Sequence, residues 1–148
     1  MIRHILVTLD GSEYSERALD HARELAQATG ARLTLFSVVL RPDSPHTPTV
    51  PKLDEDSRKR ALAYLVRKAG PLREAGLENV ATEVRFGEPA SLIADLAAEQ
   101  GVDLIAMSTH GLGASGRYAL GSIAFKVLMT APCPVFMVRI PEMTRASA

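Results

Sequence analysis

The feature that most restricts how this 148-residue chain can fold is a regular alternation between short apolar runs and longer amphipathic segments. A run that is apolar at nearly every position predicts a strand covered on both faces, which is typical of parallel sheets flanked by helices. Four runs of this kind occupy residues 5–9, 33–39, 104–107 and 135–138, and a more polar run at 80–86 predicts a strand at the edge of the sheet. The alternation therefore predicts an α/β domain.

Apolar residues recur at helical spacing between these runs. One helix is expected to follow Ser12 and to end near Thr29-Gly30, and another to begin at Pro89, an early position where proline is tolerated. A long helix around residues 62–72 is expected to be interrupted or kinked near Gly70-Pro71, because proline lacks a backbone N–H. The last helix is expected to turn four side chains inward: Ile123, Ala124, Val127 and Leu128.

Right-handed crossovers between such strands give an open, doubly wound, Rossmann-like sheet of five parallel strands with helices on both faces. Strand order 3-2-1-4-5 is the simplest arrangement. In this order the chain reverses between the first and fourth strands, and ligands of such sheets bind in the crevice at the carboxyl ends of those strands. Two unusual segments end there: Asp10-Gly11-Ser12 and a glycine-rich stretch after Met107.

The composition argues against several classes of protein. Seventeen basic residues balance seventeen acidic ones, and 5% aromatic residues without tryptophan disfavour a surface for stacking nucleic-acid bases. No apolar run approaches the roughly 20 residues of a membrane span, and a single cysteine excludes a disulfide framework. We therefore expect a cytoplasmic protein that binds neither nucleic acid nor membranes, with one domain over residues 1–142 and a flexible tail over residues 143–148.

The glycine-rich stretch carries the main indication of chemistry. Gly111, Gly113, Gly116 and Gly121 fall between a strand and a helix, where glycine brings backbone N–H groups close to an anion. Gly121-Ser122 is expected at the start of the helix, whose first amides lack partners within the helix and favour negative charge. The amides of Ile123 and Ala124 and the Ser122 hydroxyl are therefore candidates to hold a phosphate. The alternative is a connecting loop with a serine cap and no ligand.

Two better-known phosphate motifs do not fit. Gly111, Gly113 and Gly116 spell G-x-G-x-x-G, but this dinucleotide signature belongs after the first strand, with an acidic residue ending the next one. Neither glycine stretch continues as the G-K-[ST] of a P-loop. A dinucleotide-dependent or nucleotidyl-transfer enzyme is therefore supported by fold analogy alone.

Across nearly its whole length the sequence resembles the universal stress protein family. The resemblance rests on the opening strand that ends in Asp10-Gly11-Ser12, on residues 87–90 (Gly-Glu-Pro-Ala), on residues 131–135 (Ala-Pro-Cys-Pro-Val), and on the ATP-binding signature G-x-x-G-(nine residues)-G-[S/T]. Gly111 matches the second glycine of the signature, and Gly121-Ser122 match its end. Ser108 stands in place of the first glycine, and its Cβ is expected to narrow the pocket.

The resemblance implies an ATP-binding stress-response or signalling protein in which the nucleotide, with Mg²⁺, controls conformation or a partner. Asp10 is expected to contact the ribose or a bridging metal, or else only to cap its own turn. His110 lacks a companion acid or nucleophile, so we assign no catalytic residue, although slow hydrolysis remains open. By position the resemblance implies eleven ligand-binding residues: Thr8, Leu9, Asp10, Val38, Met107, Ser108, Gly111, Gly121, Ser122, Ile123 and Ala124.

The last strand suggests self-association. Val135, Phe136, Met137, Val138 and Ile140 form an apolar sheet edge, which is a liability unless it is paired. The resemblance implies a homodimer through this strand, residues 135–140. The alternative function is a nucleotide-free homodimeric interaction module of the same fold.

Overall fold

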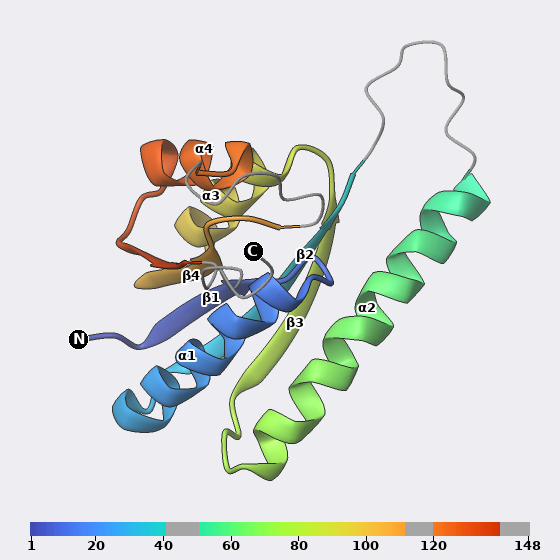
Figure 1. Cartoon of the computed structure of the whole chain (residues 1–148). Coiled ribbons are helices and arrows are strands. Elements are labelled where there is room, and N and C mark those ends of the chain that lie inside the picture. The colour runs from blue at the N-terminus through green and yellow to red at the C-terminus, as the bar shows by residue number, and fades with distance from the viewer. Residues whose placement is uncertain (41–50, 112–119, 140–148) are drawn as a thin grey trace, which may run out of the picture.

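The computed structural model describes residues 1–40, 51–111 and 120–139, and of residues 51–53 it describes the backbone. Its sheet has five parallel strands in the order β3-β2-β1-β4-β5, which confirms the predicted fold class and strand order (Figure 1). The strands are β1 (His4–Thr8), β2 (Arg32–Val39), β3 (Val80–Phe86), β4 (Leu104–Ser108) and β5 (Val135–Val138). The helices are α1 (Glu13–Thr29), α2 (Pro51–Glu74), α3 (Pro89–Glu99) and α4 (Ser122–Thr130).

Two hydrophobic layers sandwich the sheet. α1 and α2 cover one face, where Ile5 and Val7 of β1 pack with side chains of both helices (Figure 1). α3 and α4 cover the other face, where Leu6 of β1 packs with Phe36 and Ile105. Successive strand residues point to opposite faces, so β1, buried on both sides, has to be apolar at consecutive positions. This is the physical reason that the apolar runs predicted the fold.

The helix boundaries follow local capping chemistry. The Ser12 side chain accepts a hydrogen bond from Ser15 N at the start of α1, and Gly30 ends this helix in the left-handed conformation (φ 74°). At the start of α3 the Glu88 carboxylate accepts hydrogen bonds from the amides of Ala90 and Ser91, at 3.1 and 2.8 Å. Pro89 occupies the first position of α3, as expected.

The expected interruption of the long helix is wrong. α2 runs without a break through Gly70 and Pro71 to Glu74. Proline at position 71 has no N–H to donate to the carbonyl of Arg67, four residues earlier. Both residues lie on the exposed side of the helix. That carbonyl is therefore on the side open to solvent, and the helix continues.

The expected inward face of α4 is only half right. Ala124 and Val127 are buried, but Ile123 and Leu128 are 40% and 51% exposed. Both lie at the borders of a narrow stripe, because this nine-residue helix contacts the domain mainly through Ala124 and Val127. Phe125 and Met129 of α4 are also exposed, so the helix presents an apolar outer surface.

No helix in the described part of the chain is long and apolar enough to cross a membrane. The predicted tail, residues 143–148, lies outside the described residues.

A buried histidine at the start of β1 makes stability depend on pH. His4 Nε2 lies 2.7 Å from the hydroxyl of buried Thr34, and His4 Nδ1 lies 3.4 Å from both the Gln100 carbonyl and the Arg32 guanidinium. Burial, and secondly the charge of Arg32, lower the pKa of His4 below its ordinary value of 6.5. The folded state therefore favours the neutral ring.

We expect the melting temperature to fall as the pH drops below about 6.5, because the unfolded chain then binds a proton that the folded chain excludes at His4. Stability from this group is present above the unfolded pKa and is lost towards acid. In His4→Gln the fall should be shallower, as calorimetry between about pH 7.5 and about pH 5 would measure. Parallel pH profiles for the two proteins would contradict this prediction.

Candidate functional site

A cavity of about 540 Å³ opens at the carboxyl ends of the central strands, where the strand order reverses between β1 and β4. Its walls come from the ends of β1, β2 and β4 and from the starts of α3 and α4. The location is the one expected from the topology. The structure brings all eleven predicted site residues together on its wall: Thr8, Leu9, Asp10, Val38, Met107, Ser108, Gly111, Gly121, Ser122, Ile123 and Ala124.

Several lining residues were not predicted. Phe36, Ser37 and Leu40 come from β2 and the residue after it, and Pro89 and Ile93 come from α3. β2 lies beside β1, so its carboxyl end opens on the same crevice, and the strand order could have indicated these residues. Together with Val38 and Met107 they make this side of the cavity mainly apolar. The others are Ser15, Thr109, His110 and Leu120.

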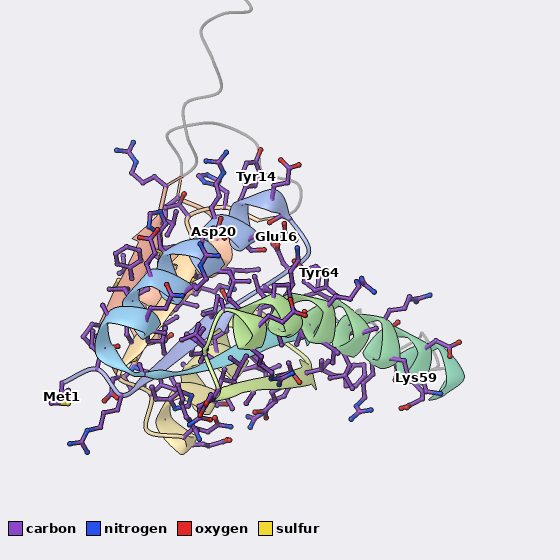
Figure 2. All side chains as sticks on the ribbon, turned by 90° about the horizontal axis from the view of Figure 1, so that it is seen from below. Met1, Tyr14, Glu16, Asp20, Lys59 and Tyr64 are labelled. Atoms are coloured by element: carbon purple, nitrogen blue, oxygen red, sulfur yellow. The ribbon has the colours of Figure 1, made fainter. Side chains whose placement is uncertain are left out.

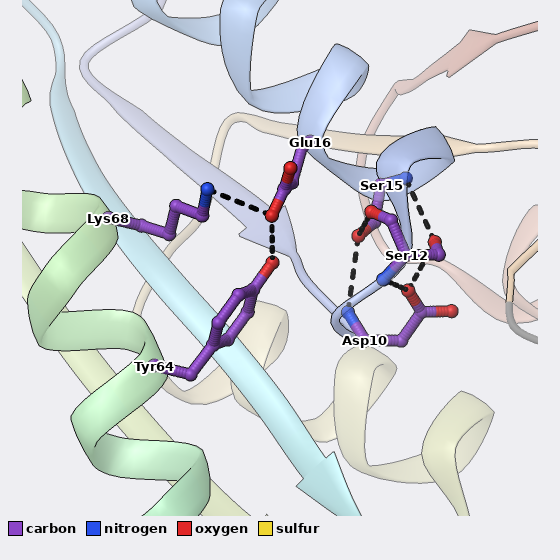
Figure 3. Close-up of polar contacts among 6 residues, drawn as sticks. All are labelled: Asp10, Ser12, Ser15, Glu16, Tyr64 and Lys68. Atoms are coloured by element: carbon purple, nitrogen blue, oxygen red, sulfur yellow. Dashed lines mark hydrogen bonds and ion pairs between the residues drawn. The ribbon is translucent and has the colours of Figure 1, made fainter.

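Asp10 organises the turn between β1 and α1. Its Oδ1 accepts hydrogen bonds from the backbone N and the hydroxyl of Ser12, at 2.9 and 2.5 Å, and its own N–H donates to the Ser15 hydroxyl at 3.3 Å (Figure 3). The turn-capping role weighed from the sequence is therefore present. One carboxylate both caps this turn and lines the cavity.

Gly111 is required by the approach of Asp10. A Cβ at Gly111 would lie 2.0 Å from Asp10 Oδ2, which is far inside contact distance. Asp10 is short and is held by Ser12, so a side chain at position 111 would break that arrangement. The sequence interpretation attributed this glycine to a phosphate; the structure shows that the protein's own carboxylate already needs it.

Gly121 is required by a backbone contact. Its N–H donates to the Thr109 carbonyl at 2.9 Å, and an added Cβ would lie 2.8 Å from the same oxygen. Thr109 N in turn donates to Val138 O of β5 at 3.0 Å. The start of α4 is thus tied to the ends of β4 and β5, and a bulky residue at position 121 would disturb the loop itself.

The first turn of α4 offers amides to the cavity. Gly121 is the N-cap, no side chain of the described residues caps it, and the first helical hydrogen bond runs from Phe125 N to Gly121 O. The N–H groups of Ser122, Ile123 and Ala124 therefore have no acceptor within the helix. All three residues line the cavity, so this end of α4 presents the positive polarity that suits an anion.

The described wall of the cavity holds no lysine or arginine, and Asp10 is its only carboxylate. His110 also lines it: His110 Nδ1 lies 3.1 Å from the Thr109 hydroxyl, and the buried Nε2 has no hydrogen-bond partner among the described residues. Within the same residues, no group of three or more histidine, cysteine or acidic side chains is placed to hold a metal ion.

A polar cluster ties α2 to the start of α1 beside this site. The Tyr64 hydroxyl donates to Glu16 Oε1 at 2.8 Å, and Lys68 Nζ lies 2.9 Å from the same oxygen (Figure 3). Figure 2 shows Glu16 and Tyr64 at the seam between the two helices. Burial, followed by the Glu16 carboxylate, raises the pKa of Tyr64 far above its usual value, so the hydroxyl stays a donor.

We expect Gly121→Ala to destabilise the protein by about 1–3 kcal/mol, because only a shift of the loop relieves the contact with Thr109 O. Gly70→Ala is the matched control: a Cβ at Gly70, inside α2, meets nothing within 4 Å. This control should gain about 0.5–1 kcal/mol through helix propensity. Urea denaturation measures both effects, and a Gly121→Ala variant as stable as the wild type would refute the backbone contact.

Comparison with known proteins identifies the family. The model of the universal stress protein family matches residues 1–139. A universal stress protein of Thermus aquaticus is 35% identical over 144 residues, which cover 94% of this chain and 100% of that protein. The structure of the universal stress protein UspA from Lactobacillus plantarum is similar with a TM-score of 0.81 and 31% identity, over 93% of this chain and 97% of that chain.

A universal stress protein crystallised in complex with cAMP is similar with a TM-score of 0.73 and 25% identity, over 94% of this chain and 98% of that chain. The match of the family model, the level of identity and the shared fold agree with the resemblance drawn from the motifs. The chain belongs to the universal stress protein family.

Proposed function

We propose that the protein is a cytoplasmic adenine-nucleotide-binding protein that takes ATP with Mg²⁺ in the cavity between β1 and β4 and responds through α4. The observation that carries the proposal is the uncapped start of α4, whose free amides open onto a cavity at the switch point of the sheet. The related structure that contains cAMP supports the class of ligand.

The end of β2 suits the adenine ring. Leu9 N donates to Phe36 O at 2.8 Å, the last backbone hydrogen bond between the β1 side and β2. Alternate residues of a strand turn their N–H and C=O groups to the same neighbour, so those of Val38 point beyond the end of β1. A donor and an acceptor side by side complement the edge of adenine, and Ile93, Pro89 and Met107 supply apolar cover.

The end of the cavity near α4 suits phosphates that are bound to a cation. The amides of Ser122, Ile123 and Ala124 attract an anion, but no basic side chain of the described wall neutralises a triphosphate. Mg²⁺ in proteins is commonly held by one or two carboxylates together with substrate phosphates. Asp10 is the carboxylate in place for that role or for a ribose hydroxyl, so ATP binding is expected to require Mg²⁺.

α4 gives the bound nucleotide a route to a partner. The helix begins at the cavity with Ser122 and carries exposed Phe125, Leu128 and Met129 further along. A ligand that orders the first turn of α4 changes the position of this apolar surface. A partner that binds the surface more tightly in one position than in the other then responds to the nucleotide.

We propose a second copy of the chain as the partner, through β5. The two edges of the sheet differ. β3 carries Glu83 and Arg85, an ion pair at 2.9 Å whose charges disfavour pairing with another strand, whereas all four residues of β5 are apolar. Phe136 of β5 is 38% exposed and lies beside α1, where its ring centroid is 5.8 Å from that of His21. The predicted Ile140 lies outside the described residues.

A nucleotide-free interaction module of the same fold is the second candidate. Its specific support is that the close approach of Asp10 to position 111, and of Thr109 O to position 121, explains both glycines without a ligand. The same homodimer would then form without a ligand.

Ser122→Pro tests nucleotide binding without breaking α4. Proline is favoured at the first helical position, and Gly121 already has the extended ψ of 151° that a residue before proline prefers. The substitution removes one amide and the hydroxyl, so we expect the affinity for ATP with Mg²⁺ to fall about tenfold or more in isothermal titration calorimetry.

Ser122→Ala is the matched control, because it loses the hydroxyl but keeps the amide and should retain most of the affinity. Equal binding by Ser122→Pro and wild type would remove the α4 amides from the site. Absence of binding by the wild type at millimolar ATP with Mg²⁺ would favour the nucleotide-free module.

Phe136→Glu tests the homodimer. A carboxylate at the β5 edge should shift the protein to the monomer in sedimentation velocity, because pairing would bring two such charges together and bury them. Ala81→Glu, an exposed position on the β3 edge, is the control and should leave association unchanged. A wild type that sediments as a monomer at micromolar concentration would rule out the interface.

A further inference from the structure

We infer that Ser108 is a positioning residue, whose hydroxyl sets the orientation of the peptide between His110 and Gly111 before a nucleotide binds. The inference rests on the proposed nucleotide site and concerns the one position at which the chain departs from the ATP-binding signature. The sequence predicted that the Ser108 side chain would narrow the pocket; its hydrogen bond gives it a different role.

The side chain of Ser108 bonds within its own turn. Ser108 is the last residue of β4, is 7% exposed and lines the cavity. Its Oγ donates a hydrogen bond to the backbone carbonyl of His110. The hydroxyl hydrogen is therefore directed at the main chain of the turn.

This bond fixes more than the carbonyl. The C=O of His110 and the N–H of Gly111 belong to one planar trans peptide and point in opposite directions. Holding the carbonyl therefore also sets the direction of the Gly111 amide. Such a constraint is needed at this position, because a peptide next to glycine can flip at little steric cost.

The neighbouring peptides are held by other bonds. Thr109 N donates to Val138 O at 3.0 Å, and Thr109 O accepts from Gly121 N at 2.9 Å. No backbone hydrogen bond among the described residues holds the carbonyl of His110, and the Ser108 hydroxyl takes that place. Ser108 thus completes a turn whose other bonds lead to β5 and to the start of α4. A preorganised turn lowers the ordering cost that a ligand otherwise meets.

The test compares Ser108→Ala and Ser108→Gly with the wild type. In the nucleotide-free variants the Gly111 amide should show conformational exchange by ¹⁵N relaxation dispersion, and ATP with Mg²⁺ should suppress it. Affinity should fall about three- to tenfold in Ser108→Ala, as expected for the loss of one hydrogen bond, and further in Ser108→Gly. The loss should appear as a less favourable entropy of binding in calorimetry.

Thr34→Val is the matched control. It removes another buried hydroxyl, bonded to His4 at the opposite end of the sheet, and should lower the melting temperature without changing the Gly111 amide or the affinity. The NMR measurement needs no ligand, so it tests Ser108 even where the wild type binds no nucleotide. An unchanged Gly111 amide in both variants, or a Ser108→Gly variant that binds as tightly as the wild type, would overturn the inference.

Discussion

The approach of the Asp10 carboxylate to Gly111 is the contact on which the site depends. β1 and β4 pair only as far as Val7 and Ala106, and after Thr8 and Ser108 the two strands lead into different loops. Asp10 spans the separation: Oδ1 holds the start of α1 through Ser12, and Oδ2 lies where a side chain at position 111 would be. Part of the crevice wall is therefore set by the close approach of two loops, which requires that Asp10-Gly11-Ser12 follow β1 and that a glycine stand at position 111 after β4.

The attachment of α4 explains how such a site can be responsive. α4 is fixed by two buried side chains, Ala124 and Val127, and by the bond from Gly121 N to Thr109 O. α4 also packs against α3, and because it is one short helix, its amide end and its apolar outer surface would move together. Under the proposed function, a ligand at the first turn and a protein partner on the outer surface would be coupled through this helix, and the coupling would be reciprocal.

The sequence predicted the sheet and the location of the cavity because both follow from local patterns and the strand order. Apolar runs reveal strands that are covered on both faces, and the strand order then identifies the crevice. The eleven residues were implied by the family resemblance, and all of them line the cavity in that crevice. The exceptions depend on three-dimensional neighbours. The spacing of apolar residues in α4 predicts which side of the helix is buried but not how wide the buried stripe is. Ile123 and Leu128 were therefore predicted to be buried, although both are exposed. Pro71 leaves α2 intact because the carbonyl of Arg67, to which it cannot donate, lies on the exposed side of the helix, and no local pattern shows this.

The balance of charge in the cavity limits what it can bind. Free amides attract an anion, yet the described wall contributes a carboxylate and no basic side chain, so each additional ligand charge meets less compensation. A cyclic nucleotide carries one negative charge, which one helix start can balance, whereas a triphosphate needs a cation that also relieves its repulsion from Asp10. Under the proposed function the site would select ligands by total charge as well as by shape, and the availability of Mg²⁺ would decide which nucleotide it favours. A lysine on the wall would remove that dependence, and since the described wall has none, the proposed function makes the metal part of the recognition.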